Sequence, residues 1–311
     1  DFMDAGTQSF YRGLYDLLTG PADRRAWVLG RRQPAFDASA ELLTVPENEE
    51  LTELVRKAKA ACDLFLLVGP PGTGKTSKGL MSLLREELAE PTAQVLLGAF
   101  TNRAVDEICG KLVEAHIDFV RVGNEMNCAP AYRPYLLKHL DEVKQLVQNV
   151  RVVVGTTLSL SSAVTKMTGK HFSLAVIDEA SQLLEPHLLP LIMAHTDGLP
   201  LIDRFVLIGD HRQLPAVVQQ PAAETARNGR DGLSALVFRP LHRAHPRRLS
   251  PRLHAPRTHA PRGGRFPQPT ILRRQTLSHP PRPPRSDNLP AARRLLRLCA
   301  RRFGVGSLPQ G

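Results

Sequence analysis

The chain has 311 residues, 42% of them apolar, which is enough to bury a sizeable core in one large domain or two ordinary ones. No apolar run reaches the ~18 residues that a membrane helix needs, and the first residues lack the basic and apolar regions of a secretory signal, so we expect neither. The four cysteines form no CxxC pair, and no histidine pair has zinc-site spacing. This pattern argues against a disulfide framework or a zinc site and is typical of the reducing cytoplasm, where we expect the protein to be located.

The net charge of +11 comes from the last quarter of the chain. Residues 238–311 contain 17 Arg, no Lys and one acid, Asp287, so they carry +16 and the preceding 237 residues carry −5. The basic composition therefore gives no information about the nucleic-acid affinity of the part that precedes this tail.

The first 63 residues predict two helices. FYRGLYDLLTG (10–20) is typical of a short amphipathic helix, and we interpret residues 1–45 as a connector or accessory segment that packs against the next domain. Residues 47–63 predict a second helix, because Leu51, Leu54 and Val55 recur at helical spacing. Since the chain begins at Asp1 rather than Met, we also expect that upstream sequence is missing.

Short apolar runs bounded by turns then alternate with helical stretches. The apolar runs are 64–69, 94–100, 119–123, 151–156, 174–180 and 205–210. The helical stretches are 75–90, 104–116 and 135–150. Continuous apolar runs are typical of parallel strands buried on both faces, and their alternation with helices predicts a doubly wound α/β sheet with helices on both faces. Functional residues are then expected just past the carboxyl ends of the strands.

The tail from residue 238 differs in kind from the rest. It holds 13 of the 26 prolines and shows helical periodicity only at 291–303. Proline at that density removes backbone hydrogen-bond donors, and unbalanced charge opposes collapse. We therefore expect residues 238–311 to be irregular and largely disordered apart from that one stretch.

A phosphate-binding loop is predicted at GPPGTGKT (69–76), which fits G-x-x-x-x-G-K-[ST] and stands between an apolar strand and a helix. The alternative is an ordinary glycine-rich turn, but such a turn would need neither the strand before it nor the helix after it. Backbone N–H groups and the helix N-terminus would bind the phosphates of ATP, Lys75 would pair with the β- and γ-phosphates, and the Thr76 hydroxyl would ligate Mg²⁺. The predicted nucleotide-binding residues are Gly69, Pro70, Pro71, Gly72, Thr73, Gly74, Lys75, Thr76 and Ser77.

Two further strand ends carry candidate catalytic groups. VIDEASQ (176–182) would deliver Asp178 to hold Mg²⁺ and Glu179 to act as the general base for the attacking water. Alone, this acidic pair could equally begin a solvated helix, but the upstream phosphate loop favours catalysis. In LIGDHRQLPAVV (207–218), the Gln213 amide could contact the γ-phosphate, although an isolated motif of this kind would favour a polar turn.

Threonine and asparagine follow two other predicted strands. Thr101 and Asn102 stand where a strand ends and a helix begins, a place suited to a phosphate of nucleotide or nucleic acid. The same residues also serve as helix caps, and chemistry alone favours that interpretation. Thr156 and Thr157 leave the same two alternatives open.

Taken together, GPPGTGKT, TNRAVDEI, VVVGTTLS, VIDEASQ and IGDHRQLPAVV resemble, in this order, motifs I, Ia, Ic, II and III of superfamily 1B helicases. The branch they resemble most comprises the DNA-replication helicase/nucleases and the RNA-surveillance helicases, over about residues 47–237. The resemblance implies a RecA-like P-loop motor domain at 46–237 that uses ATP and Mg²⁺ to translocate 5′ to 3′ on single-stranded nucleic acid, DNA in preference to RNA. It assigns Lys75, Glu179 and Gln213 catalytic roles, and it favours nucleic-acid contact for the residues Thr101, Asn102 and Thr156.

The chain departs from that family in three respects. Leu51 stands where the family usually has an adenine-reading Gln, with Asn48 nearby. The second RecA-like domain, with its arginine fingers, is not found after motif III. The tail stands in its place, and we hypothesise that the tail is an out-of-frame reading of a GC-rich gene. This hypothesis is wrong if no single-base shift restores a helicase continuation. Because an arginine finger is worth ~10³–10⁵ in rate, we expect weak nucleotide binding and slow or absent hydrolysis.

Two alternatives to a helicase motor remain at this point. The chain could be a nucleotide-binding fragment without catalysis, whose basic tail holds nucleic acid non-specifically. It could also be a P-loop kinase or another NTPase, for which Gln213 and the threonine-rich motifs would be coincidental.

Overall fold

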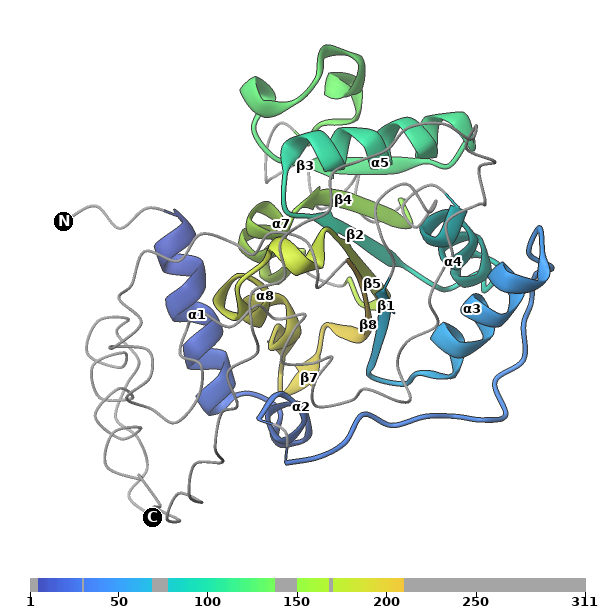
Figure 1. Ribbon diagram of the computed structural model, residues 1–311. Coiled ribbons are helices and arrows are strands. Elements are labelled where there is room, and N and C mark those ends of the chain that lie inside the picture. Colours follow the sequence, from blue (N-terminus) through green and yellow to red (C-terminus); the bar gives the residue numbers. More distant parts are fainter. Residues whose placement is uncertain (1–4, 30, 69–77, 138–149, 168–169, 210–311) are drawn as a thin grey trace, which may run out of the picture. The chain divides into compact units, whose positions relative to one another are not determined.

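The computed structural model describes residues 5–29, 31–68, 78–137, 150–167 and 170–209 (Figure 1). The chain divides into two compact units, Asp1–Ala255 and Pro256–Gly311, and all described residues belong to the first. The phosphate loop, most of the helix predicted at 135–150 and the whole tail from residue 238 lie outside the described residues. Within the described part, no helix has the length and apolar character needed to span a membrane.

The six predicted strands are confirmed, and they form one parallel sheet in the order β1-β8-β5-β2-β4-β3. Their bounds are β1 Leu64–Val68, β2 Val95–Ala99, β3 Phe119–Val122, β4 Val152–Thr156, β5 Phe172–Asp178 and β8 Ile202–Gly209. The strands β5 and β8 begin two and three residues before the predicted runs, because neighbouring pairing extends over polar residues such as Arg204. The continuous apolar pattern arises because both faces of the sheet are buried.

Helices cover both faces of the sheet, as predicted (Figure 1). Alternate residues of β1 show the two faces: Phe65 and Leu67 pack with α3, α4 and α5, whereas Leu64 and Leu66 belong to the cluster that includes α7 and α8. The helix bounds are α1 Ala5–Thr19, α2 Ala22–Val28, α3 Glu49–Ala60, α4 Leu80–Leu88, α5 Asn102–Glu114, α7 Thr157–Ala163 and α8 Glu185–Ile192. Short 3₁₀ turns are η2 Glu125–Asn127, η3 Pro130–Tyr135, η4 Val164–Lys166 and η5 Ala180–Gln182.

Several elements were not predicted from the sequence. The helix α1 is longer than the expected stretch at 10–20, and it packs on α7 and α8. The helices α2, α7 and α8 were missed because α2 lies between Pro21 and Gly30, α7 is rich in Ser and Thr, and α8 contains two prolines. A two-stranded antiparallel hairpin, β6 (His195–Thr196) with β7 (Leu199–Pro200), was missed as well.

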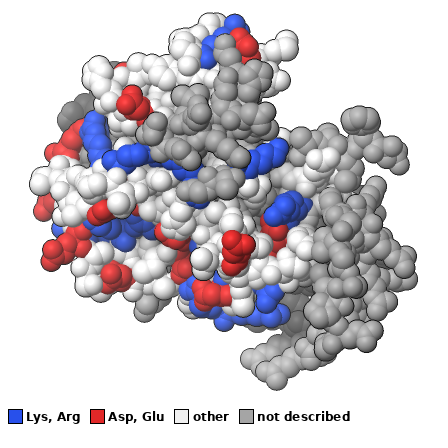
Figure 2. Space-filling view, turned by 180° about the vertical axis from the view of Figure 1, so that it is seen from behind, with Lys and Arg blue, Asp and Glu red and all other residues white. Residues whose placement is uncertain are grey.

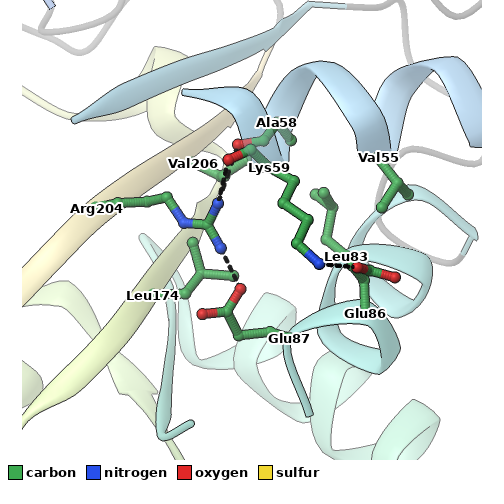
Figure 3. Close-up of a pocket in the computed structure, with 9 residues that line it drawn as sticks. All are labelled: Val55, Ala58, Lys59, Leu83, Glu86, Glu87, Leu174, Arg204 and Val206. Carbon is green, nitrogen blue, oxygen red and sulfur yellow. Dashed lines mark hydrogen bonds and ion pairs between the residues drawn. The ribbon is translucent and has the colours of Figure 1, made fainter. Parts of the chain in front are cut away.

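A network of charged side chains ties α3, α4 and β8 together near the amino ends of the strands (Figure 3). The Glu86 carboxylate, which is 3% exposed, accepts hydrogen bonds from the backbone N–H groups of Leu43 and Thr44, both at 2.8 Å, and is paired with Lys59. Arg204 donates to the carbonyls of Ala58 and Lys59 at 3.3 and 3.0 Å and pairs with Glu87. The Glu86 contacts anchor the segment that precedes α3 to α4, and the Arg204 contacts join β8 to α3 and α4, so we assign this network to stability.

We expect Glu86→Gln to lower the free energy of unfolding at pH 7 by about 1.5–3 kcal/mol, because it removes the charge that these donors stabilise. Burial raises the pKa of Glu86, but the hydrogen bonds from Leu43, Lys59 and Thr44 outweigh it, so the folded-state pKa lies below the ordinary value of 4.5. Stability from this group is therefore present above pH 4.5 and lost as the pH falls through the folded-state pKa.

Urea denaturation at pH 7 and pH 3.5 would measure this difference, which should shrink at the lower pH. Glu53→Gln is the matched control, because Glu53 is 48% exposed and its pairs with Arg56 and Lys57 lie at the surface. We expect a loss below 1 kcal/mol for the control. An equal loss in the two variants would contradict the assignment.

Candidate functional site

The candidate site lies at the edge of the sheet where the parallel strands end. The pairing register aligns Val68 of β1 with Gly209 of β8, and Ala99 of β2 with both Asp178 of β5 and Thr156 of β4. Five neighbouring strands therefore end along one line. Of the predicted site residues, Gly69 to Ser77 and Gln213 lie outside the described residues, but the strands that lead into them, β1 and β8, end on this line.

Close packing joins the ends of β8 and β5. A Cβ atom added to Gly209 would lie 2.9 Å from the backbone nitrogen of Ser181 and 3.2 Å from its Cβ, which is too close for any side chain. Ser181 belongs to η5, the turn that follows Asp178 and Glu179. Glycine is therefore required at position 209 for the acidic turn to pack against β8.

Asp178 and Glu179 occupy the end of β5, as the sequence predicts. Asp178 is the last strand residue, is 5% exposed, and accepts a hydrogen bond on Oδ1 from the Glu179 backbone N–H at 2.8 Å. Glu179 adopts a left-handed backbone conformation with φ 53° and ψ 28°, which ends the strand abruptly. This conformation is unfavourable for a residue with a Cβ atom, so the turn is locally strained at the candidate active site.

The Glu179 carboxylate is half-buried and held from two sides. Oε2 accepts a hydrogen bond from the Thr101 hydroxyl at 3.1 Å, and Oε1 accepts one from the Gln182 side chain at 3.4 Å. Burial raises the pKa of Glu179, the Thr101 hydroxyl lowers it, and the neighbouring Asp178 charge raises it again, so the net shift is upward from 4.5. A raised pKa suits a carboxylate that accepts a proton from water near neutral pH.

Thr101 and Asn102 begin the helix α5. The Thr101 hydroxyl accepts a hydrogen bond from the Ala104 N–H at 3.1 Å, which makes it the N-cap, and its additional bond to Glu179 brings motif Ia and motif II into contact. The Asn102 Oδ1 atom accepts a weak hydrogen bond from Arg121 at 3.4 Å. The cap role thus coexists with a direct link to the acidic pair.

Thr156 caps α7 in the same way. Its hydroxyl accepts from the Ser159 N–H at 3.2 Å and donates to the Ser159 hydroxyl at 2.9 Å, whereas Thr157 is 3% exposed and packs in the interior. The structure therefore brings Asp178, Glu179 and Thr101 into direct contact, while Thr156 lies on the neighbouring strand end and bonds to its own helix.

Sequence reasoning missed two residues near this site. Arg121 of β3 is 2% exposed, forms an ion pair with Asp106 of α5 at 3.0 Å, and reaches Asn102. A single charge inside the apolar run FVRVG was the available signal, because a buried charge needs a partner. Gln182 closes the motif VIDEASQ and binds Glu179, and only its helical-turn spacing from Glu179 hinted at that contact.

Leu51 and Asn48, at and near the position where the family usually has an adenine-binding Gln, both have structural roles. Leu51 is 2% exposed and belongs to the buried face of α3. The Asn48 side chain is the N-cap of that helix and accepts a hydrogen bond from the Leu51 N–H at 2.9 Å. Among the residues that the structure describes around position 51, Asn48 is thus committed to capping.

The sequence matches a protein-family model described as an AAA domain over residues 46–145 and 136–221, more than half of the chain. The chain belongs to this family, as the first RecA-like domain of a superfamily 1 helicase. The DNA replication ATP-dependent helicase/nuclease of Arabidopsis thaliana is 32% identical over 242 residues, which are 73% of this chain and 17% of that protein. Its counterpart in Schizosaccharomyces pombe is 32% identical over 241 residues, 74% of this chain and 16% of that protein.

The helicase-type motor domain therefore spans less than a fifth of the length of these two relatives. Among solved structures, the UvsW helicase of bacteriophage T4 aligns with 61% of this chain and 60% of its own, at 15% identity and a TM-score of 0.40. A superposition this loose adds nothing to the sequence match.

We expect Glu179→Gly to raise the free energy of unfolding by about 1 kcal/mol, because glycine adopts the left-handed conformation without steric cost and a half-buried carboxylate is removed. Chemical denaturation measures the change. Glu179→Gln is the control, since it removes the charge but keeps the Cβ atom, and it should gain less. A glycine variant less stable than wild type would show that the turn is not strained.

Proposed function

We propose that this helicase-type ATPase domain binds ATP with Mg²⁺ and couples its hydrolysis to movement along single-stranded nucleic acid, DNA in preference to RNA. The observation that supports this most is the alignment of strand ends. It sets Asp178 and Glu179 next to the end of β8, which leads into the Gln213 segment, and one strand further from β1, which leads into the glycine loop. The names of the relatives, DNA replication helicase/nucleases, favour DNA as the substrate. We also propose that the motor comprises residues 46–237, preceded by an accessory segment at 1–45 and followed by the tail.

The donors available at this edge fit magnesium. Mg²⁺ is usually held by one or two carboxylates together with substrate phosphates, and it needs no complete protein cage. Asp178, buried at the strand end, and Thr76 of the glycine loop would hold it, with Lys75 on the phosphates. The described residues contain no cluster of three or more His, Cys, Asp or Glu of the kind that holds a resident metal. Bound with ATP, Mg²⁺ offsets the charge that builds up on the phosphate oxygens.

Glu179 would take the proton from the attacking water. Its raised pKa makes the carboxylate a better proton acceptor than an exposed Glu. Gln213 would contact the γ-phosphate and respond to its loss, which links hydrolysis to the segment after β8. The acid limb of the pH–rate profile should accordingly lie above 4.5, the ordinary value for Glu.

Nucleic acid would bind at the other part of the same edge. The strand order places β2 and β4, which lead to Thr101, Asn102 and Thr156, on the side of β5 away from β1. Figure 2 shows Lys and Arg interspersed with Asp and Glu on the face that it presents. Because residues 1–237 carry a net charge of −5, we expect a few directed phosphate contacts to provide binding there, rather than a broad basic surface.

Lys75→Ala and Asp178→Asn should each weaken binding of a fluorescent ATP analogue about tenfold or more, the second only when Mg²⁺ is present. Fluorescence titration with and without EDTA measures both effects. Asp203→Asn is the control, because Asp203 is 54% exposed and pairs with His171 near the amino end of β8. Binding that is indifferent to Lys75 would refute a phosphate loop at 69–76.

The 311-residue chain by itself should hydrolyse ATP slowly, because the motifs that we recognise in its sequence are those of the first RecA-like domain, and the arginine fingers expected from a second domain are worth ~10³–10⁵ in rate. Single-turnover assays with excess protein measure the residual rate, which Glu179→Gln should abolish. Rapid multiple turnover stimulated by single-stranded DNA would contradict this expectation.

The same assays separate the alternatives. A kinase or unrelated NTPase would ignore single-stranded nucleic acid, whereas a non-catalytic fragment would bind it through the tail. In the second case, deletion of 238–311 would remove a steep salt dependence that Lys75→Ala leaves intact.

A further inference from the structure

The Thr101 hydroxyl makes two hydrogen bonds, one more than a helix cap needs. It accepts from the Ala104 N–H at 3.1 Å, and it donates to Oε2 of Glu179 at 3.1 Å, across 78 residues of sequence. The first bond satisfies the start of α5. The second spans the ends of β2 and β5 and holds the carboxylate proposed as the general base.

The strand order gives this second bond a direction. β2 lies on one side of β5, while β8 and then β1 lie on the other. A Glu179 carboxylate bonded to Thr101 is therefore drawn toward β2, away from the strand that leads into the glycine loop. Gln182, on η5, binds the other carboxylate oxygen at 3.4 Å, so both oxygens are engaged.

A hydroxyl group has a single proton to donate. The Thr101 hydroxyl can direct that proton to the Glu179 carboxylate or to a phosphate oxygen of nucleic acid, but not to both. Both acceptors are anions, so they compete for the same charge-assisted hydrogen bond from this hydroxyl. The cap bond from Ala104 uses a lone pair of the oxygen and is compatible with either partner.

We propose that Thr101 is a positioning residue that holds the Glu179 carboxylate on the β2 side of the sheet edge, and that a nucleic-acid phosphate which takes over its hydroxyl proton releases the carboxylate to activate water. This inference rests on the proposed function, because it requires Glu179 as the general base and nucleic acid at the start of α5. It accounts for how binding at one part of the edge increases hydrolysis at the other without a contact between the two ligands.

Two substitutions of Thr101 distinguish its hydrogen bond to Glu179 from its role as the N-cap of α5. Thr101→Val removes both bonds, whereas Thr101→Asp keeps a good N-cap acceptor but cannot donate and repels Glu179. Thr101→Ser keeps both bonds and should behave as wild type. Asn124→Ala is the control for the loss of a cap, because Asn124 accepts a hydrogen bond from the Met126 N–H at 2.9 Å at the start of η2 and has no proposed part in binding or catalysis.

The experiment is single-turnover hydrolysis by the full chain, with and without oligodeoxythymidine. We expect Thr101→Val and Thr101→Asp to raise the rate without oligonucleotide about two- to tenfold, the effect of one hydrogen bond, and to reduce the stimulation ratio toward one. Asn124→Ala and Thr101→Ser should keep the wild-type ratio. If the Thr101 variants lower both rates equally and leave the ratio unchanged, Thr101 is only a cap and the proposal is wrong.

A second measurement does not depend on turnover. The ¹³C shift of the Glu179 carboxyl carbon reports the environment of the carboxylate at a fixed pH. Oligodeoxythymidine should move this shift in the wild-type chain and in Asn124→Ala, but not in Thr101→Val, where the hydroxyl bond is already absent. An equal movement of the shift in Thr101→Val overturns the positioning role. A wild-type chain that fails to bind ATP, or that hydrolyses ATP equally well as Glu179→Gln, instead overturns the proposed function and the inference with it.

Discussion

Everything functional in this domain depends on the register between parallel strands. Because the strands run the same way and Ala99 pairs with both Asp178 and Thr156, groups that are far apart in sequence are delivered to one line. No long side chain or loop closure is needed to bring them together. The hydrogen bonds of the sheet supply the alignment, and buried apolar residues on both faces keep the register from slipping.

The strand order divides that line into two regions with different chemistry. The strands β1 and β8 lead to residues proposed for phosphate binding, β2 and β4 lead to residues proposed for nucleic-acid contact, and β5 lies between them. Glu179 therefore lies at the boundary between these two regions, at the end of β5. It combines a strained left-handed backbone with a half-buried carboxylate. A boundary residue of this kind can respond to both ligands, which suits a motor better than a simple hydrolase.

The sequence predicted the elements better than their contacts. The six strands followed from apolar runs such as LFLLV, since burial on both faces leaves little ambiguity. The placement of β8 between β1 and β5 could not be read from the sequence, because pairing depends on long-range packing. The same holds for the bond from Thr101 to Glu179, which looked like two separate local motifs. The helix α8 was not predicted because it contains Pro186 and Pro190, and proline has a very low helix propensity.

The tight fit of Gly209 against Ser181 has a mechanical consequence. With no side chain between them, the end of β8 and the turn after Asp178 are in backbone contact, so one cannot shift toward the other without displacing it. A methyl group at position 209 would force the end of β8 and the acidic turn apart, and it would break this coupling.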